Sequence, residues 1–355
     1  MSFRLISFVF KIGHVFGITP WSLEVPKISL FKKFYYTLIF VLLMYGFIAR
    51  EVVHLRSNSR QLILLYIINN IAFVGQNSAF LLRSWMKRKS WIRFLRNLEI
   101  TANLTRVQTK TTSKNFFYCG FLFVSILHLL TYTFLVDALN QIHSNVWRNF
   151  YAEYFHEMFN FHNQFLSCVL VNMIRTRYKN LRKMVHGHFE RRRYIHLGAL
   201  KKIQYTVRSL KLTVEGYNDL FGWTNLFNIC ISLVNTLNLT QSTLFKLGRV
   251  EFVRLNVFNL IFIAWILGGT FTVIFFMNSV LREYHEMTRF CENAKHLLNV
   301  TNVEELKLRE CSRFLAQNAP EFTAAKFFPI KRNFILSILS IFVNFEIAII
   351  QMGYK

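Results

Sequence analysis

Polar side chains form one line along an otherwise apolar stretch between residues 150 and 174. The line consists of Glu153, Glu157, Asn160 and Gln164, at i, i+4, i+7 and i+11, with His156 and Asn163 beside it. That spacing places the four on one face of a helix. Carboxyl and amide groups in such a row can bind a small polar ligand, or they can form hydrogen bonds to neighbouring helices. We interpret the row as the wall of a ligand pocket, with interhelical bonding as the alternative.

Other polar residues lie in neighbouring apolar stretches. Asn69, Asn70, Gln76 and Asn77 fall within 62–82, and Asn77 is the one that we assign to the pocket. Trp265, beside the Gly268-Gly269 pair, is a further candidate for the lining. For each of these residues taken singly, packing between helices explains the sequence equally well.

The last apolar stretch, 334–352, carries a second polar line. On a helix Asn344, Ala348 and Gln351 share one side, with Phe345 and Met352 flanking it. If several copies surrounded an axis, Gln351 would form a polar ring and Met352 an apolar constriction of the kind that gates by dewetting. The alternative is that Asn344 and Gln351 bond neighbouring helices within one subunit.

Residue patterns for enzyme chemistry are not evident. The pair His186 and His188 lacks cysteine or carboxylate partners at metal-ligand spacing. We see no phosphate-binding glycine loop and no nucleophile elbow. We therefore expect a protein that is not an enzyme and that needs no cofactor or metal.

The elements that must position these residues are membrane helices. Of the 355 residues 53% are hydrophobic, 39 are Phe and only 4 are Pro, a composition too apolar for a soluble domain. The apolar residues gather in runs near the length that crosses a bilayer. Because lipid offers no partners for open backbone groups, we predict an all-α integral membrane protein. Its seven expected spans are roughly 34–50, 62–82, 116–136, 150–174, 220–245, 255–281 and 334–352.

The net charge of +25 is distributed between the runs. Residues 83–115 hold nine Lys or Arg against one acid, and 175–211 hold twelve against one. Positive residues favour the cytoplasmic side, which places the N-terminus inside and the C-terminus outside. This distribution argues against nucleic acid as a partner and for contact with anionic membrane lipid.

The same distribution defines the parts of the chain. We expect a cytoplasmic N-terminal segment, 1–33, and then spans one to six over 34–281. Within them lie the basic cytoplasmic loops 83–115 and 175–211 and a pocket in the outer half. A cytoplasmic segment follows over 282–333, and the last span with a short extracellular tail occupies 334–355.

The C-terminal stretch APEFTAAKFFPIKRNFILSILSIFVNFEIAIIQM, 319–352, resembles the signature of insect gustatory receptors. In that family an FTA-x-x-FF block precedes the last span, and here Phe322-Thr323-Ala324 and Phe327-Phe328 match it. The last span of the family then carries TY, five apolar residues and QF. Asn344, Phe345, Gln351 and Met352 occupy those positions here, so only the glutamine is retained.

The resemblance implies a ligand-gated, nonselective cation channel in the plasma membrane of sensory neurons. It implies a tetramer of identical or related subunits, whose last helices line the pore and whose 282–333 segments hold the assembly together. A small-molecule tastant would open the channel from the outer-half pocket. Because no carbohydrate-site pattern is evident, we favour bitter or noxious compounds over sugars or carbon dioxide.

Three alternatives remain open. A seven-helix receptor coupled to G proteins would have the opposite orientation to the one that the charges indicate. A transporter would be favoured by an inverted repeat or by paired charges in broken helices, and neither is visible. The altered TY and QF positions leave open a partner subunit that assembles with related receptors without recognising the ligand itself.

Overall fold

The computed structural model describes residues 10–11, 13–14, 19–20, 30–31, 33–41, 44, 60–105, 126, 130, 133, 146–191, 197–246, 253–297 and 302–353. Its main helices are α3 (Arg60–Trp85), α4 (Arg88–Leu104), α6 (Val146–Arg191), α7 (Leu197–Lys246), α8 (Val253–Leu297), α9 (Asn302–Gln317) and α10 (Asn333–Gly353). Two short strands, β1 (Thr323–Ala324) and β2 (Phe328–Pro329), lie between α9 and α10. For the described residues, the predicted all-α fold is confirmed apart from this hairpin.

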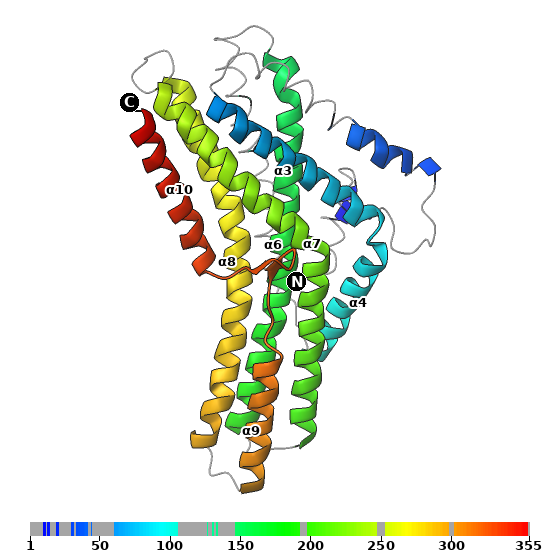
Figure 1. Ribbon diagram of the computed structural model, residues 1–355. Coiled ribbons are helices and arrows are strands. Elements are labelled where there is room, and N and C mark those ends of the chain that lie inside the picture. The colour runs from blue at the N-terminus through cyan, green and yellow to red at the C-terminus, as the bar shows by residue number, and fades with distance from the viewer. Residues whose placement is uncertain are drawn as a thin grey trace.

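Helices α6, α7 and α8 are the longest elements and run side by side along the molecule (Figure 1). They contain 46, 50 and 45 residues. At about 1.5 Å per residue each is roughly 70 Å long, more than twice the hydrocarbon thickness of a bilayer. The two segments that we expected to be loops are therefore largely helical. Helix α4 lies within 83–115, while α6 and α7 continue through most of 175–211.

Buried apolar residues recur along two of the long helices at alternating steps of four and three. In α7 they are Ile203, Val207, Leu210, Val214, Tyr217 and Phe221, and in α8 they are Val273, Met277, Val280, Tyr284, Met287 and Cys291. This is the spacing with which helices pack along a continuous seam. The seam explains why α7 and α8 stay packed against each other beyond their most apolar stretches.

Helix α4 packs across α7 through a cluster of aromatic and aliphatic side chains. Its Trp91, Phe94 and Leu98 are completely buried. Gly216 of α7 lies directly beneath Phe94, where an added Cβ would come within 3.3 Å of the ring. The absence of a side chain at Gly216 therefore lets α4 sit close to α7.

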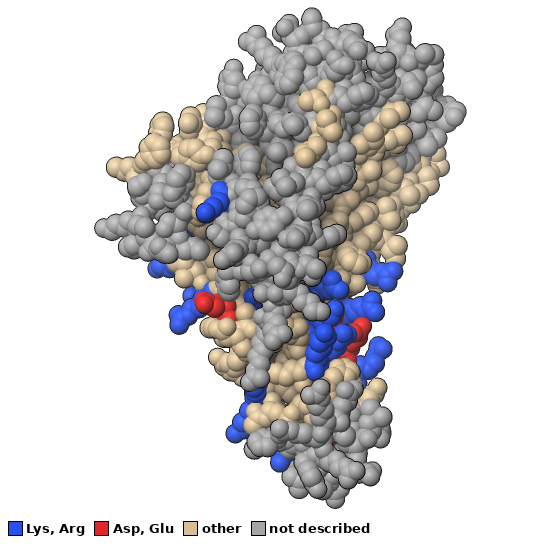
Figure 2. All heavy atoms as spheres, turned by 180° about the vertical axis from the view of Figure 1, so that it is seen from behind, with Lys and Arg blue, Asp and Glu red and all other residues tan. Residues whose placement is uncertain are grey.

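Helix α9 lies at one end of the bundle, and α10 runs alongside the opposite half toward the C-terminus (Figure 1). The hairpin β1–β2 joins them near the middle, with Thr323 paired to Pro329 and Ala324 paired to Phe328 in antiparallel register. On the face in Figure 2, most of the described Lys and Arg side chains gather in the lower half of the molecule.

Among the described residues, two helical segments are long and apolar enough to cross a membrane, Gly198–Thr240 and Ile263–Asn293. Asn333–Phe345 in α10 forms a shorter apolar helix. Of the first expected span, 34–50, the structure describes 34–41 and 44, which are helical, and the third, 116–136, falls mostly outside the described residues. The count of seven spans and the orientation of the termini therefore stay predictions.

Candidate functional site

A buried group of amide side chains connects three helices. Gln76 of α3 donates through Nε2 to Oδ1 of Asn160 on α6 at 3.1 Å, and to Oδ1 of Asn228 on α7. Gln76 is fully buried, and the exposed fractions of Asn160 and Asn228 are only 3% and 5%. In such a low-dielectric setting satisfied hydrogen bonds hold helices in one register.

Two helical turns further along α3, Arg83 makes a second connection between the same helices. Its Nη1 donates to Oδ1 of Asn163 on α6 at 2.9 Å and to Oγ1 of Thr224 on α7 at 3.3 Å. The guanidinium carbon also lies 4.4 Å from the ring centroid of Phe221 and 5.8 Å from that of Trp91. A charged group with 2% exposure is thus surrounded by amide, hydroxyl and aromatic partners.

Hydroxyl groups extend this buried polar layer. Ser167 of α6 bonds the phenol of Tyr217 on α7, and Ser232 of α7 lies 2.5 Å from Thr270 of α8 between their oxygens. Within 69–84, 160–167, 224–236 and at 270, the buried polar side chains are Asn69, Asn70, Gln76, Asn77, Arg83, Ser84, Asn160, His162, Asn163, Gln164, Ser167, Thr224, Asn225, Asn228, Ser232, Thr236 and Thr270. Most of them carry neutral amides or hydroxyls.

Two residues of the predicted row on α6, Asn160 and Gln164, lie inside this buried polar layer. Asn160 bonds Gln76, and Gln164 is buried against Gly269 of α8, where an added Cβ would overlap the Gln164 amide. Interhelical contact therefore accounts for these two residues. The side chains of Glu153, His156 and Glu157 lie outside the described residues, although their backbone belongs to α6.

Two further pocket candidates border the same region. Asn77 is 7% exposed. Its Oδ1, like that of Asn69, has no hydrogen-bond partner among the residues that the structure describes. Trp265 of α8 lies 5.8 Å from Phe161 of α6 between ring centroids. Buried acceptors without donors are costly, so a donor group of a ligand would be favoured at Asn69 and Asn77.

Helix α10 presents the pore candidates on its exposed side. Asn344 and Gln351 are exposed, Phe345 and Ala348 are half-buried, and the side chain of Met352 lies outside the described residues. Ile338, on a different side of the helix, is 2% exposed and packs on the core. Among the described residues, Asn344 and Gln351 of the predicted polar line therefore stay exposed and are not buried by packing.

The same line on α10 is longer than predicted. Asn333, Ser337 and Ser340 lie on it, at i, i+4 and i+7 from Asn333, with Asn344 at i+11 and Gln351 at i+18. All of these side chains are exposed. The regular spacing is visible in the sequence, but two serines in an apolar helix are too common to indicate a polar face by themselves.

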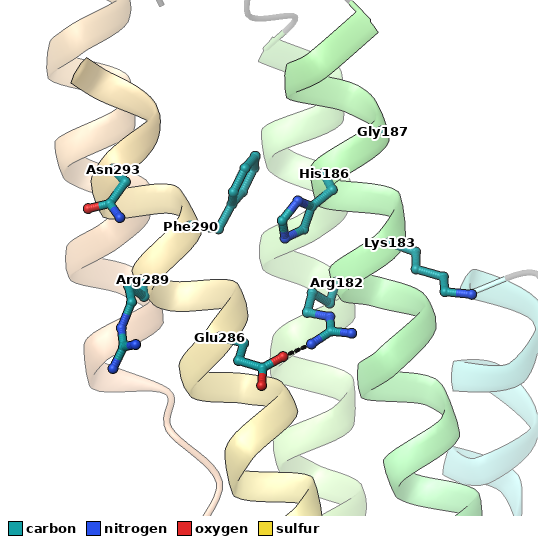
Figure 3. A pocket seen from close by; sticks show the side chains of 8 residues that line it. All are labelled: Arg182, Lys183, His186, Gly187, Glu286, Arg289, Phe290 and Asn293. Carbon is teal, nitrogen blue, oxygen red and sulfur yellow. Dashed lines mark ion pairs between the residues drawn. The ribbon is translucent and has the colours of Figure 1, made fainter. Parts of the chain in front are cut away.

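The C-terminal parts of α6 and α8 border a cleft of about 620 Å³. Figure 3 shows Arg182 and Glu286 pointing toward each other across it, and Arg182 also lies 3.2 Å from Glu283 between Nη1 and Oε2. His186, one of the two histidines considered as metal ligands, instead stacks on Phe290 with 3.6 Å between ring centroids. These contacts hold α6 against α8. The sequence did not predict them, because the partners lie about a hundred residues apart in the chain.

Comparisons with known proteins agree with this architecture. A family model described as "7tm Chemosensory receptor" matches residues 6–355. The fold is similar to the insect olfactory receptor OR5 from Machilis hrabei, with a TM-score of 0.68, 15% identity and 98% coverage of both chains. The structure of that receptor in complex with eugenol gives a TM-score of 0.67 and 15% identity, covering 98% of this chain and 99% of the other. No curated protein matches the sequence.

Proposed function

The chain belongs to the 7tm chemosensory receptor family, and we propose that it is a gustatory receptor that acts as a ligand-gated, nonselective cation channel. In this proposal it spans the plasma membrane of sensory neurons seven times. Four subunits, identical or related, surround a pore lined by α10. A tastant, of the bitter or noxious class rather than a sugar, opens it.

The exposed polar line of α10 is the observation that carries the proposal. Large apolar side chains such as Leu336, Ile341 and Val343 are more than half exposed on the same helix, with 66%, 53% and 51% of their surface accessible. Lipid accommodates those side chains, but it penalises Asn344 and Gln351. A rotationally symmetric assembly resolves the conflict, because the polar lines then face a shared water-filled axis.

The buried polar layer among α3, α6 and α7 supports a ligand site in the half of the molecule that contains α10. Asn69 and Asn77 offer acceptors to a ligand, and Trp265 offers an aromatic face. For a ligand to open the channel, it must bind the open arrangement more tightly than the closed one. The helix α7 is suited to transmit that preference because it contacts both α3 and α10.

The first experiment is to locate the C-terminus. An epitope after Lys355 should be stained on intact cells, while one before Met1 should require permeabilisation. The opposite result would contradict the channel topology and would favour a receptor coupled to G proteins.

Current recordings then test the pore. Replacing Gln351 or Asn344 with alanine should change unitary conductance or cation selectivity. The matched change Leu339→Ala, about 120° or more around the helix from those two residues, should leave both unchanged. Unaltered conductance in both polar variants would remove α10 from the pore. Current from this chain alone indicates a homomeric channel, and current only after co-expression with a related receptor indicates a partner subunit.

A further inference from the structure

The hairpin between α9 and α10 contains two adjacent non-glycine residues in the left-handed backbone region. Ala325 has φ 50° and Lys326 has φ 66°. They form the turn between β1 and β2, across which the amide of Phe327 donates to the carbonyl of Ala324 at 2.9 Å. Positive φ at both central positions is the geometry that Asn and Gly adopt most readily. With alanine and lysine there, the turn is strained because each Cβ crowds the backbone.

Contacts with α7 hold this strained turn in place. The Asn218 amide uses both ends, donating through Nδ2 to the carbonyl of Glu321 at 2.7 Å and accepting from the amide of Thr323 at 3.2 Å. One turn later, Gly222 lets the hairpin lie against the helix. A Cβ at Gly222 would come within 3.1 Å of the backbone nitrogen of Ala325. The hairpin therefore packs on α7 because Asn218 bonds its backbone and Gly222 leaves room for it.

Aromatic contacts continue from α7 through the hairpin to α10. Phe322 is fully buried with its ring 5.5 Å from that of Tyr217, and Ile330 donates its amide to the Phe322 carbonyl at 2.7 Å. Phe328 then stacks on Phe334, in the first turn of α10, at 4.9 Å. A displacement of α10 must therefore move the hairpin, and a displacement of the hairpin must alter its contacts with α7.

The same stretch of α7 also takes part in the buried polar layer. Thr224, two residues beyond Gly222, accepts from Arg83, and Asn228 accepts from Gln76. Residues 217–228 therefore join the proposed ligand side of the molecule to the hairpin that leads into α10. The contacts that could sense a ligand and those that position α10 are separated by less than three helical turns.

We propose that Asn218 and the Ala325–Lys326 turn are positioning residues that couple α7 to α10. The docked turn holds α10 in a non-conducting position. The strain of the turn reduces the net free energy that the docking contacts give to the closed state. A ligand that binds the open state more tightly can therefore shift the equilibrium toward opening. This inference rests on the proposed channel function, and it concerns the balance between closed and open states rather than the pore itself.

Two substitutions should shift that balance in opposite directions. Lys326→Gly removes the strain of the docked turn and should lower the open probability without ligand about fivefold, since relief of one unfavourable φ is worth roughly that factor. Asn218→Ala removes both docking hydrogen bonds and should raise it by at least about fivefold. The matched control Lys326→Ala removes the charge beside Asp219 but keeps a non-glycine residue in the turn, and it should behave as wild type.

The measurement uses the full chain reconstituted in planar lipid bilayers without any ligand, with single-channel open probability and unitary conductance as readouts. Unitary conductance should be the same in all variants, because none of the changes lies on the polar line of α10. Faster hydrogen exchange at the Thr323 and Phe327 amides in Asn218→Ala should accompany the rise in open probability.

The outcomes separate the coupling from the proposed function. Ion conduction with open probabilities of Lys326→Gly and Asn218→Ala within twofold of wild type would refute the coupling alone. A shift of Lys326→Ala equal to that of Lys326→Gly would also refute it, because charge rather than strain would then be responsible. A wild-type chain that conducts no ions, alone or with a related receptor, would refute the channel function and the coupling together.

Discussion

Replacing Asn163 with leucine removes the oxygen that accepts a hydrogen bond from Arg83 and keeps the number and branching of the side-chain heavy atoms. Asn163 is fully buried on α6, and Nη1 of Arg83 on α3 lies 2.9 Å from its Oδ1. Because arginine has no acceptor, the orientation of this amide is determined, and its Nδ2 must point elsewhere. That nitrogen has no hydrogen-bond partner within the described part of the chain.

The expected cost follows from these contacts. A hydrogen bond to a charged group contributes about 1.5–3 kcal/mol in soluble proteins. Between membrane helices, side-chain hydrogen bonds average about 0.6 kcal/mol and reach about 1.7. Arg83 would keep Thr224 and its aromatic neighbours, and the unpaired Nδ2 disappears with the substitution. We therefore expect Asn163→Leu to lower the free energy of unfolding by about 1–1.5 kcal/mol.

The assay is denaturant-induced unfolding of the purified chain in mixed micelles, arranged as a double-mutant cycle with Arg83→Met. In the Arg83→Met background, Asn163→Leu should cost less than about 0.3 kcal/mol, because its partner is absent. Thr224→Val, which removes the longer bond of 3.3 Å, serves as the graded comparison and should cost about 0.5 kcal/mol. An equal cost of Asn163→Leu in both backgrounds would show that the bond to Arg83 does not hold α3 to α6.

Two further substitutions and one labelling experiment test other parts of the structure. Gln76→Leu should destabilise the fold by about 1–2 kcal/mol, since it removes bonds to both α6 and α7, and a loss below about 0.3 in the same unfolding assay would contradict that role. Arg182→Gln removes the ion pairs with Glu283 and Glu286, yet it should lower the free energy of unfolding by less than about 1 kcal/mol, because water screens partly exposed ion pairs. A larger loss of stability would show that water does not screen these pairs. Burial raises the pKa of the Cys311 thiol to about 11. Since only the thiolate reacts, alkylation at pH 8 should be slow in the folded chain and should accelerate on unfolding; equally fast labelling of both states would place Cys311 at the surface.

Local patterns in the sequence were enough to predict the helical class and the candidate residues. Asn160 and Gln164 fall on one side of α6 because a four-residue spacing places side chains on one face wherever a helix forms. The line from Asn344 to Gln351 on α10 follows from the same periodicity. The FTA-x-x-FF block pointed to the family because its residues are contiguous in the chain.

Partners far apart in the sequence were beyond such reasoning. Gln76 meets Asn160 and Asn228 across 84 and 152 residues. Asn218 meets the hairpin across more than a hundred residues. The full lengths of α7 and α8 could not be predicted either, because hydropathy shows where a helix is apolar and not how far a heptad seam extends it.

By itself the sequence determined which residues share a helix face, where the apolar runs lie and which receptor family the C-terminal stretch resembles, because these depend on neighbours within a few turns. Only the tertiary structure decided that Gln76 of α3 bonds Asn160 of α6 and Asn228 of α7, and that Arg83 is enclosed by aromatic rings. It also decided that a strained turn docks on Asn218 and Gly222 of α7. The physical reason is that a hydrogen bond or a close packing contact depends on distances of a few tenths of an ångström between helices, and those distances exist only once the helices have packed.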